Sequence, residues 1–98
     1  MNAIPIKIRG QWWIIKVGVP PTWGDDEITY GETLHDQRVI LIYTDTHLSE
    51  SALIETYLHE ILHAALPDCG EEAVRSAAMA QTGLLKILGV IGKDSEND

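Results

Sequence analysis

The sequence has a single cysteine, few basic residues and no phenylalanine. One cysteine excludes an intrachain disulfide, and Cys69 is compatible with a reducing compartment. Seven Lys and Arg residues against fifteen Asp and Glu give a formal net charge of −8. Such a surface repels nucleic-acid phosphate, so no nucleic-acid partner is expected.

The chain also lacks a long apolar run. No stretch approaches the roughly 20 apolar residues that cross a bilayer, and the start of the chain lacks the pattern of a signal peptide. These observations predict a cytoplasmic protein with no membrane partner. With 98 residues, the chain is expected to form one domain over residues 1–92, followed by a disordered acidic tail over residues 93–98.

Two runs of β-branched and aromatic residues near the N-terminus predict a β-hairpin. The expected strands are Ile6 to Arg9 and Trp12 to Val19, joined by Gly10-Gln11 as a two-residue type II′ turn. Alternation along the second strand would place Trp13 on one face and Trp12 on the other. Val39 to Tyr43 is an unbroken apolar run that is too short for a helix, which predicts a central strand buried on both faces.

Two helices are expected after these strands. Ser49 is a good N-cap for a first helix that runs to about Leu66, because Pro67 prevents continuation. A second helix is expected from Glu71 to about Leu88-Gly89, with Asp68 as its cap. Together these elements predict an α+β fold, in which a small antiparallel or mixed three-stranded sheet packs on two helices.

The first of these helices contains the sequence His59-Glu60-Ile61-Leu62-His63. Side chains four positions apart lie on one face of a helix, so both imidazoles can bind one divalent ion with Glu60 beside them. This H-E-x-x-H spacing is typical of zinc peptidases. The alternative is an ordinary amphipathic helix with two solvated histidines. Ser51 to Leu66 contains no Lys or Arg, which indicates that the histidine face is the floor of a cleft rather than a solvated surface.

A catalytic zinc site uses three protein ligands, so a third must come from outside this helix. Four side chains that follow it are candidates: Asp68, Cys69, Glu71 and Glu72. Cys69 comes ten positions after His59, and Asp68 is expected to cap the next helix. Glu71 borders the apolar half of that helix beside Val74 and Ala78, whereas Glu72 projects into its polar half. We therefore expect Glu71 to turn inward.

A single zinc ion on His59, His63 and Glu71 would polarise a substrate carbonyl and activate a water molecule. Glu60 would act as general acid and base, moving a proton from that water to the leaving amine. The chemistry expected is cleavage of a protein or peptide substrate, bound in extended form along an edge strand. Three side chains are candidates for stabilising the oxyanion: Tyr30, His35 and Tyr57.

The order of strand, short loop, H-E-x-x-H helix and a second helix opening with Glu71-Glu72-Ala73-Val74 resembles the small zincin-like metallopeptidases of phages and bacteria. Those are related in plan to the ImmA/IrrE and SprT groups. The stretches Lys7-Ile8-Arg9-Gly10 and Gly31-Glu32-Thr33 extend the resemblance over most of the chain.

The resemblance implies a minimal gluzincin-like fold, with His59, His63 and Glu71 as zinc ligands and Glu60 as catalytic acid and base. ImmA/IrrE proteins usually have Ala-Asn after the region of their third-ligand Glu, whereas Val74 and Arg75 follow Ala73 here. This departure leaves Glu72 as an alternative to Glu71.

Two other functions fit parts of the pattern. A catalytically idle zincin scaffold could keep zinc in order to bind a partner, although such a site has no need of Glu60. A metal-dependent nuclease resembling the rRNA-processing YbeY type also carries spaced histidines on a helix. That enzyme would require a third histidine where this chain has Cys69, and a basic groove that a net charge of −8 does not favour.

Overall fold

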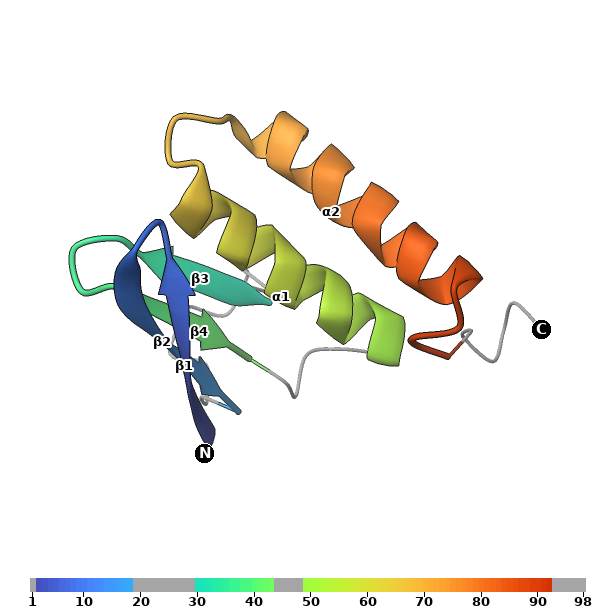
Figure 1. Ribbon diagram of the computed structural model, residues 1–98, viewed down its shortest axis with the longest axis horizontal. Helices are drawn as coiled ribbons and strands as arrows, with labels where there is room; N and C mark the ends of the chain where they lie inside the picture. Colours follow the sequence, from blue (N-terminus) through green and yellow to red (C-terminus); the bar gives the residue numbers. More distant parts are fainter. Residues whose placement is uncertain (1, 19–29, 44–48, 93–98) are drawn as a thin grey trace, which may run out of the picture.

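The computed structural model describes residues 2–18, 30–43 and 49–92 and has the predicted α+β class (Figure 1). The four strands and two helices of this part are β1 (Asn2–Ile8), β2 (Gln11–Val17), β3 (Gly31–Leu34), β4 (Val39–Ile42), α1 (Glu50–Ala65) and α2 (Glu71–Ile87). The predicted acidic tail over residues 93–98 and the predicted end of the second strand at Val19 lie outside the described residues.

The sheet has four strands, so the prediction of three is wrong. The additional strand is β3, whose sequence Gly-Glu-Thr-Leu contains only one large apolar residue. It pairs antiparallel with β4, from Gly31 opposite Ile42 to Leu34 opposite Val39. A strand of four mostly polar residues has too little hydrophobic alternation to be recognised in a sequence, and its pairing with β4 defines it instead.

The strand order is β1-β2-β4-β3, and the sheet is mixed because β2 and β4 run parallel. The predicted internal position of Val39–Ile42 is confirmed, and β1 and β3 form the two edges. Burial of β4 on both faces is only partly confirmed. Ile40 and Ile42 are fully buried against the core, whereas Val39 and Leu41 on the other face are half-buried.

The N-terminal hairpin is confirmed, but its turn differs from the prediction. Ile8 pairs with Gln11, so the two turn residues are Arg9 and Gly10 rather than Gly10 and Gln11. Their φ angles are 51° and 78°, and positive φ at both positions defines a type I′ turn, which matches the twist of the flanking strands. At Arg9 this left-handed conformation costs about 1–2 kcal/mol, because its Cβ approaches the following carbonyl.

The first strand also begins earlier than predicted, at Asn2 rather than Ile6. It therefore includes Pro5, which lacks a backbone donor. An edge strand accommodates proline because one of its sides has no partner strand, and β1 is such an edge.

The hydrophobic core lies between one face of the sheet and α1, which in turn lies between the sheet and α2 (Figure 1). The buried members of the core are Ile8, Trp13, Ile15, Ile40, Ile42 and Ala64. The predicted faces of β2 are confirmed, since Trp13 is 5% exposed and the adjacent Trp12 is 61% exposed. This packing fixes the side of α1 that carries the core residues, and therefore the direction in which its polar residues point.

The boundaries of α1 follow the predicted signals. The Ser49 hydroxyl accepts a hydrogen bond from the Ala52 amide at 3.2 Å, which confirms Ser49 as the N-cap. The helix ends at Ala65, two residues before Pro67. Within the three described ranges, neither helix is long and apolar enough to cross a membrane.

The N-terminal cap of α2 differs from the prediction, whereas its C-terminal end lies where it was predicted. The N-cap is Gly70 without a side-chain hydrogen bond, so Asp68 lies two residues too early to cap the helix. At the other end, Gly89 has a φ of 77° and Val90 donates to the Leu85 carbonyl at 3.0 Å, as in a Schellman motif.

Only part of the predicted apolar half of α2 is buried. Val74, Ala78 and Thr82 form a buried stripe with a four-residue spacing. By contrast, Leu84 is 54% exposed and Ile87 is 82% exposed, although both lie in the apolar half of the helical wheel. The reason is that α2 packs chiefly on one helix, which covers a single narrow stripe.

Candidate metal centre

Two histidines on successive turns of α1 form one side of the candidate site. The Nε2 atoms of His59 and His63 lie 3.1 Å apart, and the ring centroids are separated by 4.8 Å. Their side chains are only 20% and 22% exposed. The four-residue spacing therefore brings the two imidazoles together in the structure, rather than leaving them apart in solvent.

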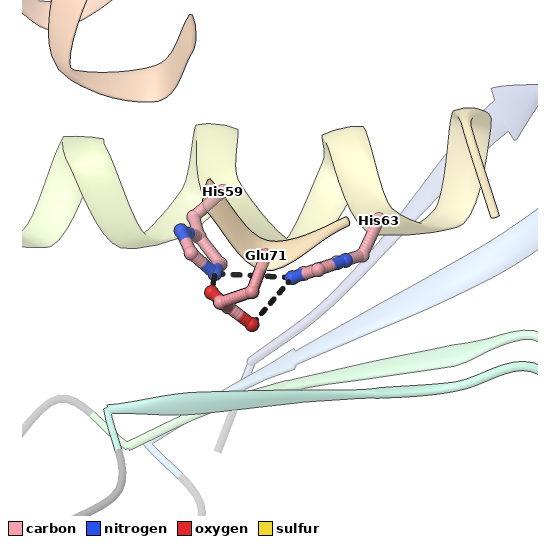
Figure 2. A group of neighbouring side chains, drawn as sticks. All are labelled: His59, His63 and Glu71. Atoms are coloured by element: carbon pink, nitrogen blue, oxygen red, sulfur yellow. Dashed lines mark hydrogen bonds and ion pairs between the residues drawn. The ribbon is translucent and has the colours of Figure 1, made fainter. Parts of the chain in front are cut away.

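Glu71, the first residue of α2, lies against both histidines (Figure 2). Its Oε1 is 2.6 Å from His59 Nε2, and its Oε2 is 3.2 Å from His63 Nε2. One ligand atom from each of the three side chains falls within 4.8 Å of the other two. In the described part of the chain this is the group of His, Cys, Asp and Glu residues that could hold a metal ion.

The packing of α2 explains why Glu71 is the carboxylate that arrives here. Glu71 lies three positions before Val74 and seven before Ala78, so it continues the stripe that packs on α1. Glu72 is one position away from this stripe. Its side chain is 93% exposed and pairs with Arg75 at 3.1 Å.

The other candidate ligands lie elsewhere. Asp68 and Cys69 are both exposed in the short link between the helices, and neither belongs to the group of converging ligand atoms. The structure therefore brings Glu71, and not Glu72, Asp68 or Cys69, to the histidines.

The donor set fits a zinc ion. Two imidazole nitrogens and one carboxylate oxygen are a known set of catalytic zinc ligands. Tetrahedral ligands at normal zinc distances are about 3.3 Å apart, and the separations of 3.1 and 3.2 Å come close to this value. The separation of 2.6 Å between His59 and Glu71 is shorter than this tetrahedral edge.

The surroundings also favour a cation. A pocket of about 500 Å³ opens beside these ligands. Its lining contains three carboxylates, Glu55, Glu60 and Glu71, and a single Arg or Lys residue, Arg75. An excess of negative charge of this kind favours a cation over an anion.

Glu60 is buried beside the ligands, with 8% of its surface exposed. The hydroxyl of Thr33 on β3 donates to it, with Glu60 Oε1 at 2.7 Å and the Glu60 backbone oxygen at 3.0 Å. Burial raises the pKa of the Glu60 carboxyl above its ordinary value, while the Thr33 hydrogen bond and the two neighbouring histidines oppose this rise. The carboxyl is thus held in one position and made more basic than in water.

The close approach of β3 to α1 depends on Gly31. A Cβ atom at Gly31 would lie 3.0 Å from Glu60 Cγ and 3.0 Å from the Leu41 carbonyl oxygen. The absence of a side chain at this position lets the strand cover Glu60. Nothing in the sequence indicated a role for Gly31 or Thr33. Thr33 lies 27 residues from Glu60 in the chain, and only the pairing of β3 with β4 brings the two together.

Of the three candidates for stabilising an oxyanion, the structure brings one to the pocket. Tyr30, the residue before β3, lines it. His35 instead lies with its ring 6.0 Å from the Trp13 ring, in a different pocket. Tyr57 packs against the core. Arg75 also lines the metal-side pocket and was not identified from the sequence.

Comparisons with protein-family models, with curated proteins and with solved structures find no match for this chain. The function is therefore inferred from its own residues and their geometry.

Proposed function

We propose that this chain is a zinc-dependent peptidase of the cytoplasm with a minimal zincin-like fold. In this proposal His59, His63 and Glu71 hold one zinc ion, and Glu60 is the general acid and base. The observation that supports it most strongly is the convergence of these three side chains beside a fourth side chain, the buried carboxylate of Glu60. A purely structural zinc site has no use for Glu60, which would remain buried at a cost.

When bound by these residues, zinc would act as a Lewis acid on the substrate carbonyl and would lower the pKa of water towards neutrality. Glu60 takes the proton from the attacking water on its carboxylate and delivers it to the nitrogen of the leaving amine. Its raised pKa favours the first step, because a more basic carboxylate accepts a proton from water more readily. Thr33 orients the carboxylate through its hydrogen bond of 2.7 Å.

The substrate proposed is a protein or peptide in extended conformation. β3 is an edge strand that runs beside α1, and its first residue, Gly31, lines the pocket. An edge strand offers backbone donors and acceptors to an extended chain. The side chains of Tyr30 and Arg75, which also line the pocket, carry the donors that could stabilise the oxygen of the tetrahedral intermediate.

The decisive experiment compares three proteins: wild type, His63→Ala and Glu60→Gln. Bound metal is measured by elemental analysis after incubation with zinc, and cleavage is measured on a library of unstructured peptides. We expect about one zinc per chain in wild type and in Glu60→Gln, and a large loss in His63→Ala. Glu60→Gln should reduce cleavage by about 100-fold or more, the usual contribution of a general base.

Other outcomes would redirect the proposal. A wild-type protein that binds no zinc would overturn it. Stoichiometric zinc without cleavage of any peptide would favour a binding protein that keeps the scaffold, and cleavage of RNA would favour a nuclease.

A further inference from the structure

A second pocket, of about 450 Å³, lies away from the metal ligands. It is built where three chain reversals meet: the β1–β2 turn, the β3–β4 turn, and the end of α1 (Figure 1). Ala64, at the end of α1, lines it, whereas the preceding His63 lines the metal-side pocket. The two pockets therefore lie on different sides of the same helical turn, and we name this one the arginine pocket after Arg9 and Arg38.

The accessible lining of the arginine pocket is mostly polar, and core residues lie beneath it. Its lining includes the core residues Ile8, Trp13 and Ala64, each 5% exposed. The exposed residues around them are Arg9, Gln11, His35, Asp36 and Arg38. With histidine neutral, the lining has two positive charges and one negative charge, in a chain whose net charge is −8.

The two guanidinium groups are not neutralised by the rest of the described chain. Within residues 2–18, 30–43 and 49–92, neither Arg9 nor Arg38 forms a side-chain hydrogen bond or an ion pair, and Asp36 pairs with neither. Acidic residues outnumber basic ones by fifteen to seven, so unpaired arginines are unexpected here. Two of them at one pocket leave donors available for an external anion.

The backbone gives an independent reason to single out the same two residues. Arg9 and Arg38 have φ angles of 51° and 54°, and they are the non-glycine residues with positive φ in the described part of the chain. Glycine or asparagine adopts this left-handed conformation with less strain. Arginine is therefore a poor choice for the backbone at both turns, and strain of this kind concentrates at functional positions.

We propose that the arginine pocket binds an oxyanion, a carboxylate or phosphate group. The planar guanidinium of arginine offers paired donors that match both kinds of oxyanion. This site is separate from the proposed metal centre and does not depend on it.

The test uses two probes with the same body, benzoate and phenyl phosphate. Each is titrated into the full-length protein after bound metal and chelator have been removed by dialysis, and binding is followed through the backbone amide NMR signals of Gln11, Asp36 and Ala64. We expect saturable shifts with at least one probe. The probe that binds more tightly identifies carboxylate or phosphate as the natural group.

Matched variants assign the binding to the two arginines. Arg9→Asn and Arg38→Asn should each weaken binding at least tenfold. Both should unfold at or above the wild-type temperature, since asparagine tolerates positive φ, so lost binding would not reflect lost folding. Lys16→Gln removes the same charge from an exposed position outside the pocket and should leave binding within twofold.

Two results would overturn the proposal. The first is the absence of saturable shifts with both probes. The second is equal weakening by Lys16→Gln and by the two arginine variants, which would indicate a general charge effect instead of a site.

Discussion

The candidate metal centre has two unequal halves. On the sheet side, Glu60 is 8% exposed and lies under β3, and Gly31 leaves no room for a Cβ atom. On the α2 side, the Glu71 side chain is 55% exposed, and a Cβ atom added at the N-cap residue Gly70 would meet nothing within 4 Å. One half is tightly packed, and the other lies open at the surface.

This difference separates two kinds of role. The buried half holds the proposed catalytic carboxylate in place through the packing of the sheet, so its residues contribute to folding as well as to the site. The open half contributes the proposed third ligand from the first turn of a helix, so changes there should affect metal binding and little else. Four predictions test this contrast, in order of decreasing effect.

The largest effect is expected on the open side, from Glu71→Ala. Loss of residues that only support a ligand lowers metal affinity by about 10–100-fold, so loss of a ligand itself should cost at least about 100-fold in zinc affinity. The matched control is Glu72→Ala, which removes a neighbouring exposed carboxylate and should leave zinc affinity nearly unchanged. Competition with a chromophoric chelator measures both. Equal losses in the two variants would contradict the assignment of Glu71.

On the packed side, Gly31→Ala should destabilise the fold by about 1–3 kcal/mol, the usual cost of overpacking. The new Cβ would lie 3.0 Å from a backbone oxygen that cannot move freely. The control is Gly83→Ala, within α2, where a Cβ atom meets nothing within 4 Å and helix propensity should add about 1 kcal/mol. Urea denaturation measures both free energies of unfolding. Stabilisation by both substitutions would show that β3 does not press on α1.

Thr33→Val should lower kcat about tenfold, or about 1.4 kcal/mol, while zinc affinity and KM change little. The variant removes the donor that orients Glu60 and leaves a side chain of similar shape. Thr33→Ser retains the hydroxyl and should keep most of the activity. A parallel loss of zinc in Thr33→Val would mean that the hydroxyl supports the metal ligands rather than the carboxylate.

The smallest effect is expected at Tyr43, which is 3% exposed and donates to Glu32 Oε1 at 2.7 Å. Burial, the hydrogen bond to Glu32 and nearby carboxylates raise its pKa to about 12. Since the unfolded tyrosine loses its proton near pH 10, this group's contribution to stability is complete below that pH and is lost as the pH rises towards about 12.

Tyr43→Phe should therefore be less stable than wild type at pH 8 and show a shallower decline above pH 10. Urea denaturation at several pH values between 8 and 11.5 would measure this decline. Parallel curves for the two proteins would contradict the raised pKa.

The strong local signals in the sequence were enough to predict much of the fold. Ser49 and Pro67 correctly bounded α1, and the alternation of Trp12 and Trp13 correctly assigned the faces of β2. Weak or non-local signals failed. The four residues of β3, of which only Leu34 is large and apolar, become a strand through their pairing with β4. The exposure of Leu84 follows from the narrow contact between α2 and α1.

The same division applies to the candidate site. The spacing of His59 and His63 predicted their proximity, because helix geometry is local and places every fourth residue on one face. Helical periodicity also favoured Glu71 over Glu72. The hydrogen bond from Thr33 and the unpaired arginines at two distant turns have no signature along the chain, since each depends on where separate elements pack.

By itself, then, the sequence determined the α+β class, the extent of α1 and the four-residue spacing that presents two imidazoles to one side, because each of these depends on interactions within a few residues. Only the tertiary structure decided that β3 covers Glu60, that Glu71 reaches the histidines and that Arg9 and Arg38 face one pocket. Those outcomes follow from contacts between separate elements of the fold, whose free energy depends on the packing of the whole chain.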